Sequence, residues 1–257
     1  MTSVGSMLEM SRVAFAYDTE AVVQDFSMSV SRAEIIALLG PSGCGKSTLL
    51  RLIAGLQKPT SGQIHMSNAM SHTVGMLFQD FDAYPWLTVW DNVERGSGPK
   101  PYPTRTAVDD ALIAVGLDNH TKKYPAELSG GMRKRLAIAR CIVRRPGILL
   151  LDEPFASLDL AARFDMYALL QKVACASESQ VGCSVILVTH DIQEAILLAD
   201  RILVLTPRPM HLRQEIVVSF PRARATANIG TPEFASIESQ LYRLIDPRRL
   251  TGAAETG

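Results

Sequence analysis

The sequence has few of the features that mark secreted, metal-binding or membrane-spanning chains. Its 257 residues include only four cysteines, Cys44, Cys141, Cys175 and Cys183, which form neither a CxxC pair nor a cluster with zinc spacing. The first fifteen residues lack a charged start followed by an apolar core, so no secretory signal is predicted. No apolar run reaches the roughly 18 residues of a membrane span. We therefore expect a chain from a reducing compartment, soluble by itself and without a structural metal.

The chain also lacks an excess of charge of either sign. It carries 26 basic and 26 acidic residues, which gives a formal net charge of zero. Proteins that coat nucleic acid usually carry a basic excess, so no nucleic-acid partner is expected. Hydrophobic residues make up 47% of the sequence, which is enough to bury a sizeable core in one large domain.

Hydrophobic patterning predicts an α/β fold. The first 35 residues alternate apolar and polar side chains in places, as short, partly antiparallel strands do. Continuous apolar runs in EIIALLG, GILLLDEP and SVILVTHD predict buried strands of a mainly parallel sheet. Helical spacing fills the region from about 82 to 145, which predicts an inserted helical lobe. We expect one domain, 1–257, whose extension 221–257 holds a helix with apolar residues Phe234, Ile237, Leu241, Leu244 and Ile245.

A glycine-rich segment, GPSGCGKS, matches the pattern G-x-x-x-x-G-K-[ST] between a predicted strand and a predicted helix. Its glycines let backbone N–H groups surround a β-phosphate. Lys46 would reach the β- and γ-phosphates, and Ser47 would offer a hydroxyl to Mg²⁺. The alternative is a glycine-rich turn that happens to contain a lysine, and the strand-to-helix context disfavours it.

Polar side chains follow three further predicted strands. Asp152 ends a buried run, at the strand edge where ligands bind in such sheets, and is expected to hold Mg²⁺. Glu153 is placed to polarise an attacking water, unless the acid pair merely faces solvent. His190 could hydrogen-bond a γ-phosphate, and the amide oxygen of Gln79 could ligate Mg²⁺ and the water. Each of the last two signals is weak alone. A histidine at a strand end is more often structural, and a single glutamine by itself means almost nothing.

A second, incomplete anion site lies in LSGGM. Gly130 and Gly131 open a predicted helix, whose first N–H groups would point at an anion. No Lys-Ser pair follows to complete a phosphate site. Ser129 is also a good helix N-cap, and the two roles are compatible.

These motifs, in this order, resemble the ATPase subunits of ABC transporters from about Met10 to Leu250. LLLDEP is similar to the Walker B motif, LSGGM to the signature, Ser157–Asp159 to the D-loop, Gln79 to the Q-loop and His190 to the switch histidine. Tyr17 matches the aromatic residue that stacks on adenine, with Phe15 a weaker candidate. GPSGCGKST is similar to the Walker A motif, whose positions here are Gly40, Pro41, Ser42, Gly43, Cys44, Gly45, Lys46, Ser47 and Thr48.

The resemblance implies an ATPase that uses ATP and Mg²⁺ and works as a head-to-tail pair with a second copy of itself. Ser129, Gly130 and Gly131 would then contact the γ-phosphate of ATP bound to the other copy. Met132 stands where the family usually has Gln, but backbone groups and Ser129 are expected to carry most of this contact. The linker in RGSGPKPYPT is shorter than usual, which leaves the local shape of the lobe open.

A transporter ATPase without membrane spans requires partners. The resemblance implies separate integral-membrane permease subunits, an extracytoplasmic solute-binding protein that acts indirectly, and a peripheral position on the cytoplasmic face of a bacterial inner membrane. YPWLTVWDNV, LSGGM and HDIQEAILLADRILVLTPRP with the following FPRAR look most like the group that imports nitrate, sulfonate, taurine or bicarbonate. The ATPase itself never touches the solute.

Two other functions compete with transport. A soluble ABC-type ATPase of DNA repair or translation usually has long coiled coils, zinc modules or two ATPase domains, which this sequence lacks. A small-molecule kinase with a phosphate loop leaves LSGGM and SLD without a role.

Two surface features also stay open at the sequence level. The aromatic residues Phe81, Tyr84, Trp86 and Trp90 suit either a groove for the permease or the core of the lobe. The basic run is either a solvated helix face or a site near lipid headgroups or the channel; it comprises Arg133, Lys134, Arg135, Arg140, Arg144 and Arg145.

Overall fold

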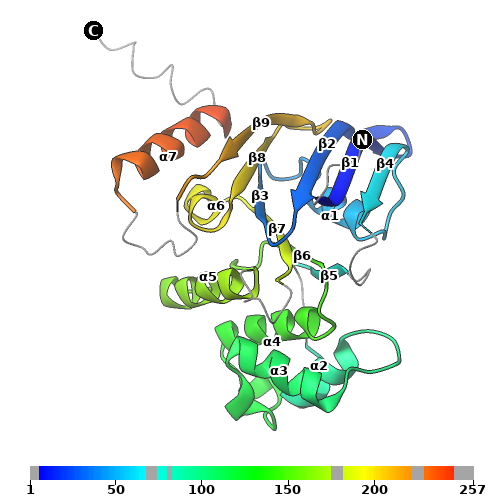
Figure 1. Ribbon diagram of the computed structural model, residues 1–257, viewed down its shortest axis with the longest axis vertical. Coiled ribbons are helices and arrows are strands. Elements are labelled where there is room, and N and C mark those ends of the chain that lie inside the picture. Colours follow the sequence, from blue (N-terminus) through cyan, green and yellow to red (C-terminus); the bar gives the residue numbers. More distant parts are fainter. Residues whose placement is uncertain (1–5, 68–73, 80–82, 175–181, 221–228, 246–257) are drawn as a thin grey trace. The chain divides into compact units, whose positions relative to one another are not determined.

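The computed structural model describes residues 6–67, 74–79, 83–174, 182–220 and 229–245 (Figure 1). The chain divides into two compact units. The first comprises Met1–Met66 with Ile186–Gly257, and the second comprises Ser67–Val185. The predicted lobe, 82–145, lies within the second unit. Phe81 and Cys175 lie outside the described residues.

The first unit begins with an antiparallel sheet in the order β2-β1-β4. It is built from β1 (Ser6–Tyr17), β2 (Glu20–Ser31) and β4 (Ser61–Met66). In β2 the buried side chains Phe26, Met28 and Val30 alternate with exposed ones, because successive side chains on a strand point to opposite faces. The predicted antiparallel N-terminal part is therefore confirmed.

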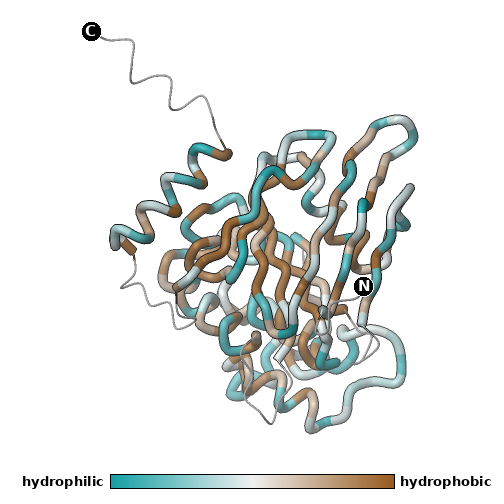
Figure 2. The backbone as a smooth tube through the Cα atoms, turned by 45° about the horizontal axis from the view of Figure 1, so that its top comes forward, coloured by the Kyte–Doolittle hydropathy of each residue, from teal (hydrophilic) through white to brown (hydrophobic). Residues whose placement is uncertain are grey.

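The other strands of this unit differ in burial. β3 (Ile35–Leu39) and β8 (Arg201–Leu205) run parallel and are buried along almost their whole length, whereas β9 (Leu212–Val217), which pairs antiparallel with β8, is mostly exposed. Figure 2 shows the contrast: the strands of the antiparallel sheet change hydropathy along their length, whereas β3, and β8 after Arg201, are hydrophobic throughout. This is the pattern expected of strands covered on both faces. The short helix α1 (Lys46–Ile53) follows β3.

Two helices close the first unit. α6 (Ile192–Leu198) packs on β3, and α7 (Pro232–Ile245) packs on α6. Phe234 and Leu241 of α7 are fully buried, as the helical spacing of the tail predicts. The tail helix therefore packs within the first unit.

The second unit pairs two parallel strands, β5 (Val74–Leu77) and β6 (Ile148–Asp152). Its helices are α2 (Val89–Gly96), α3 (Arg105–Val115), α4 (Gly130–Ile142) and α5 (Leu160–Ala174), with short 3₁₀ turns at Asp118–His120 and Pro125–Glu127. Helices α2, α3 and α4 pack on one another (Figure 1). The division between the two units falls within β7 (Ser184–Thr189). Among the described residues no helix has the length and apolarity to cross a membrane.

Polar side chains begin and brace the helices of the lobe. Thr88 and Thr104 cap α2 and α3 through side-chain oxygens that accept backbone N–H groups. The fully buried Asn92 donates to the carbonyls of Tyr84, Leu87 and Thr88 and accepts the N–H of Tyr84 at 2.9 Å. Its amide therefore fixes the segment that leads into α2.

The basic run in α4 and just after it does not form a fully solvated face, because Arg135, Arg140 and Arg144 are half-buried. Arg140 donates to the carbonyl of Gly96 at the end of α2, at 3.0 and 3.2 Å, and Arg135 donates to Val115 O at the end of α3, at 3.2 Å. The last carbonyls of a helix have no intrahelical partner and attract cations. The arginines therefore satisfy the helix ends that neighbour α4.

Candidate functional site

The glycine-rich loop follows β3 and leads directly into α1, as predicted. Gly43 and Gly45 have φ angles of 73° and 121°, which favour glycine. A Cβ on Gly45 would lie 2.8 Å from Val22 Cγ1, and one on Gly40 would lie 3.0 Å from Leu205 Cβ. The loop therefore needs glycine at these positions to keep its path against the neighbouring strands.

Lys46 lies at the first position of α1 and turns its ammonium back into the loop. Its Nζ donates to Gly40 O at 2.8 Å and to Pro41 O at 2.9 Å, and the residue is only 6% exposed. This buried cation and the positive end of α1 act together on the same loop. Ser47 and Thr48 supply hydroxyls next to it. Such an arrangement suits a phosphate group.

Cys44 takes part in this loop through its backbone. Its side chain is 2% exposed, and burial raises the pKa of the thiol, so it stays neutral near pH 7. The N–H of Cys44 donates to Pro41 O at 3.3 Å, which closes a turn of the loop.

Tyr17 ends β1 with a half-exposed ring. The ring makes an edge contact with Phe15, with centroids 4.9 Å apart, and Gln57 donates a hydrogen bond to its hydroxyl at 2.7 Å. That hydrogen bond lowers the pKa of Tyr17. An aromatic face held in place and open to solvent is suited to stacking on a flat ring. Gln57 belongs to no recognised motif, so nothing in the sequence indicated that it contacts Tyr17.

His190 lies in the turn between β7 and α6 and is exposed. The next residue, Asp191, caps α6: its Oδ1 accepts the N–H groups of Gln193 at 2.8 Å and Glu194 at 3.2 Å. The imidazole is thus presented at a strand end, as the sequence predicts.

The predicted carboxylates lie in the second unit at the end of β6. Asp152 is 6% exposed, whereas Glu153 is half-buried and has a φ of 47°. A glutamate in this left-handed region costs conformational energy, and such residues gather at functional sites. Since Leu77 of β5 pairs in parallel with Leu151 of β6, Gln79 follows its strand at the same sheet edge as Glu153. These three side chains offer oxygen ligands of the kind that Mg²⁺ prefers.

The LSGGM segment begins α4. Ser129 is the N-cap, and its Oγ accepts the N–H of Met132 at 3.3 Å. Ser129 and Gly130 are exposed, and a Cβ on Gly130 would meet nothing within 4 Å. Neither crowding nor a positive φ requires glycine at position 130. A partner that approaches this helix start closely would require it.

The start of α5 lies beside the start of α4. A Cβ on Gly131 would lie 3.5 Å from the Cβ of Ala162, and Asp159 caps α5 by accepting the N–H of Ala162 at 2.9 Å. Ser157, which precedes the cap, has a φ of 68°. The predicted signature and D-loop are therefore neighbours in the second unit.

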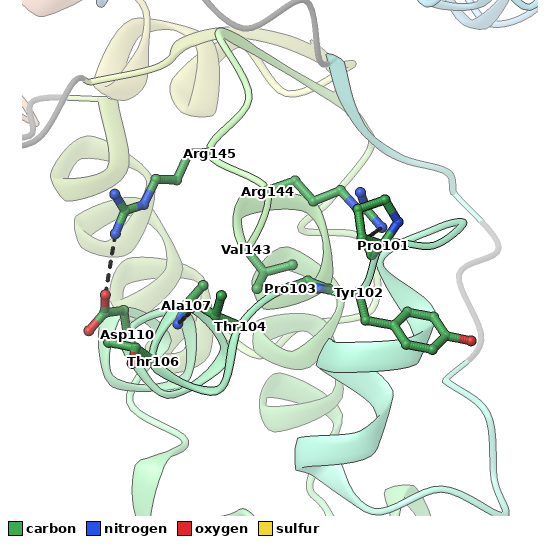
Figure 3. A pocket seen from close by; sticks show the side chains of 10 residues that line it. All are labelled: Pro101, Tyr102, Pro103, Thr104, Thr106, Ala107, Asp110, Val143, Arg144 and Arg145. Carbon is green, nitrogen blue, oxygen red and sulfur yellow. Dashed lines mark hydrogen bonds and ion pairs between the residues drawn. The ribbon is translucent and has the colours of Figure 1, made fainter.

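The predicted site residues thus fall into two groups. The first unit holds Tyr17, the loop 40–48 and His190, and the second holds Gln79, Asp152, Glu153 and the segment 129–131. A pocket of about 490 Å³ in the second unit contains none of them (Figure 3). There Arg145 reaches Asp110 at 3.4 Å, and the lining comprises Pro101, Tyr102, Pro103, Thr104, Thr106, Ala107, Asp110, Val143, Arg144 and Arg145.

A buried strand that runs through a glycine-rich loop into a helix beginning with Lys-Ser defines a nucleotide-binding protein of the P-loop class. The comparisons with known proteins then give the family. The model of the family described as "ABC transporter" matches residues 23–156. The chain belongs to the ABC transporter family, and it is an ATP-binding, ATP-hydrolysing cassette.

Relatives of this chain are named as import ATP-binding proteins. It is 37% identical over 245 residues to the aliphatic sulfonates import ATP-binding protein SsuB 3 of Pseudomonas syringae pv. tomato, covering 94% of this chain and 86% of the relative. It is also 37% identical to the nitrate import ATP-binding protein NrtD of Synechocystis sp., covering 88% of each. These relatives favour transport over DNA repair or translation.

Solved structures agree with the fold. A dimeric ATP-binding cassette with bound ADP and phosphate, in a post-hydrolysis state, has a TM-score of 0.68 and 28% identity, covering 84% of this chain and all of that one. The protein cbiO1 from Clostridium perfringens, part of the ABC transporter complex cbiONQ, has a TM-score of 0.74 and 26% identity, covering 92% of this chain and all of that one. The predicted α/β ATPase fold is confirmed.

Proposed function

We propose that two copies of this chain pair head to tail around two ATP molecules, and that hydrolysis drives solute import through a separate permease. The observation that carries the proposal is the exposed start of α4. Gly130 has open space around it and an ordinary φ, so the fold of one copy does not explain the glycine. A γ-phosphate held by the glycine-rich loop of a second copy would approach these N–H groups at the positive helix end.

Each predicted residue has a role in this proposal. The loop 40–48 and Lys46 hold the phosphates, and Tyr17 stacks on adenine. Ser47, Gln79 and Asp152 would hold Mg²⁺, whose charge would neutralise that of the phosphates. Glu153 accepts the proton of the attacking water, and His190 hydrogen-bonds the γ-phosphate. Ser129, Gly130 and Gly131 of one copy complete the site of the other.

Replacing Glu153 with Gln tests this assignment. The amide keeps the shape of the side chain but cannot accept a proton, so kcat should fall at least about 100-fold while ATP still binds. Two copies should then remain joined by ATP. ATPase assays, nucleotide titration and size-exclusion chromatography with ATP or ADP measure the three effects. Wild-type turnover would remove Glu153 as the base, and an ATP-loaded monomer would overturn the pairing.

We further propose that the permease contacts Tyr84 and Trp86. Trp86 is 70% exposed, and its ring lies 5.6 Å from that of Tyr84. Trp90 is half-buried instead and donates to Asp109 at 2.9 Å, so it belongs to the lobe. Exposed aromatic residues side by side suit a protein interface. The chain would then lie on the cytoplasmic face of the inner membrane, with an extracytoplasmic solute-binding protein acting indirectly.

Co-expression with a candidate permease from the same genome tests the partner. The Trp86→Ala variant should lose about tenfold or more in affinity for the permease, because buried aromatic residues dominate interfaces. Its ATPase activity without the permease should be unchanged. Transport in vesicles supplied with nitrate, sulfonate, taurine or bicarbonate then identifies the solute, which we propose is one of these small anions. Undiminished co-purification of the variant would exclude this surface.

A further inference from the structure

The turn that carries His190 is anchored by two buried polar side chains. Thr189, the last residue of β7, is 2% exposed, and Glu194, in the first turn of α6, is 6% exposed. Thr189 Oγ1 donates to Glu194 Oε2 at 2.6 Å. The same hydroxyl accepts the N–H of Asp191 at 3.0 Å. One hydroxyl therefore ties the strand end, the turn and the helix together.

The hydrogen bonds act on both sides of His190. Before it, Thr189 is fixed by its strand and by Glu194. After it, Asp191 donates to Thr189 and caps α6. The outer side of the same helical turn is also held, because Gln193 donates to Glu238 of α7 at 3.0 Å. The backbone on either side of the exposed imidazole is thus held in place by side chains from three elements.

Burying the polar pair Thr189 and Glu194 costs free energy, so the pair needs an explanation such as fixing the conformation of the turn. Glu194 is 6% exposed, so the burial of its carboxylate carries a desolvation penalty. A charge-assisted hydrogen bond offsets part of that penalty and restricts the two groups to one geometry. Apolar residues of similar size would often be at least as stabilising as a buried polar pair. Stability alone is therefore a poor explanation for the pair.

We propose that Thr189 and Glu194 are positioning residues, whose hydrogen bond holds His190 where it meets the γ-phosphate. The proposal rests on the role of His190 proposed above. Neither residue touches the nucleotide; both act through the turn. Their loss should slow hydrolysis and leave ATP binding intact, because the loop 40–48 lies elsewhere in the sequence and keeps its own contacts.

The decisive variant is Thr189→Val, which keeps the β-branched shape suited to a strand end and removes the hydroxyl. We expect kcat to fall about ten- to a hundred-fold, as small misplacements of catalytic groups do, with KM changed less than about threefold. Thr189→Ser, which restores the hydroxyl, should recover kcat to within about threefold of the wild type. A loss of ATP affinity with unchanged kcat would overturn the proposal.

A double-mutant cycle with His190→Ala separates this proposal from the one on which it rests. If Thr189 acts through His190, Thr189→Val should lower kcat much less in the His190→Ala background than alone. If the two effects multiply instead, Thr189 acts elsewhere and the positioning role is wrong. If His190→Ala alone leaves kcat unchanged, the role of His190 itself is wrong.

Glu34→Gln is the matched control. Glu34 is also a buried carboxylate of the first unit, 7% exposed, but it accepts from Ser31 N at 2.6 Å and pairs with Arg201 at 2.9 Å. This variant should lower the unfolding midpoint without changing kcat. If Thr189→Val does not fold, Glu194→Gln takes its place in the cycle. It keeps the side-chain shape and weakens the hydrogen bond, so a kcat loss of severalfold is expected, and multiplicative effects with His190→Ala would again overturn the proposal.

Discussion

Glycine residues in this chain are there for two different physical reasons. A Cβ on Gly62 would lie 2.3 Å from Arg12 O, so the antiparallel sheet cannot accept a side chain there. Gly130 lies in open space at the start of α4 and has an ordinary φ. The first glycine is required by the fold. The second is not required by the contacts of one copy and fits the proposed approach of a second copy.

Gly130→Ala should therefore separate stability from activity. The free energy of unfolding should stay the same or rise by about 0.5 kcal/mol, because alanine favours a helix and restricts the unfolded chain. In the proposed pair the new methyl group would stand between α4 and the γ-phosphate bound to the other copy, so kcat should fall about tenfold or more. Urea denaturation and ATPase assays on the same preparation measure both.

Gly116→Ala provides the control for this substitution. Gly116 ends α3 with a φ of 71°, and its Cβ would lie 3.1 Å from Arg135 Nη1. Here we expect a loss of about 1 kcal/mol in stability with unchanged kcat. If Gly130→Ala destabilises the chain as Gly116→Ala does, or leaves hydrolysis intact, the glycine of the signature has a structural role only.

At the scale of elements, α4 links the exposed signature to the rest of its lobe. It begins at the Ser129 cap, and Arg140 near its other end donates to Gly96 O and stacks on Tyr84, with Cζ 4.8 Å from the ring centroid. Arg144 donates to Ser97 O at 2.9 Å. The position of α4 thus depends on carbonyls at the C-terminal end of α2, those of Gly96 and of the cap residue Ser97.

Arg140→Ala should destabilise the protein by about 1–3 kcal/mol, because the Gly96 carbonyl loses a charged donor in a half-buried setting. Arg145→Ala is the matched control, because Arg145 lies three residues after the end of α4. The side chain of Arg145 is 76% exposed and its oxygen partner on Asp110 is 3.4 Å away, so its loss should cost less than about 0.5 kcal/mol. Equal effects of the two variants in urea denaturation would contradict the capping role of Arg140.

At the scale of the whole molecule, the proposed pairing requires each site to use two copies. A mixture of inactive variants tests this requirement directly. Lys46→Ala removes the cation that we propose holds the phosphates, and it leaves the signature intact. Ser129→Arg blocks the signature and leaves the phosphate loop intact. In a head-to-tail pair of the two, one site combines both defects and the other combines the two intact halves.

Mixing equal amounts of these variants should restore hydrolysis to about a quarter of the wild-type rate, since half of the pairs are mixed and each has one intact site. Each variant alone should be inactive. Titrating one variant against a fixed amount of the other in an ATPase assay measures the recovery. A mixture as inactive as its components would show that the signature acts within its own chain.

The amino-acid sequence by itself was sufficient for the local motifs and for the fold class. Contacts between residues close in the chain account for several features. These are the loop between β3 and α1, the Ser129 cap, the strand-end positions of Asp152 and His190, and the amphipathic α7. Buried strands and helical spacing carry the α/β assignment in the same way. These features depend on backbone conformation and on which face is apolar, and both leave a periodic signal.

Only the tertiary structure decided which distant groups those residues meet. The basic run serves helix ends that lie 20 or more positions earlier in the chain, as with Arg135 and Val115 O. Trp90 joins the lobe while Trp86 stays exposed. Gln57 donates a hydrogen bond to the hydroxyl of Tyr17, which lies 40 positions earlier. The physical reason is that periodicity shows where a side chain faces, whereas a hydrogen-bond partner is set by packing between elements far apart in the sequence.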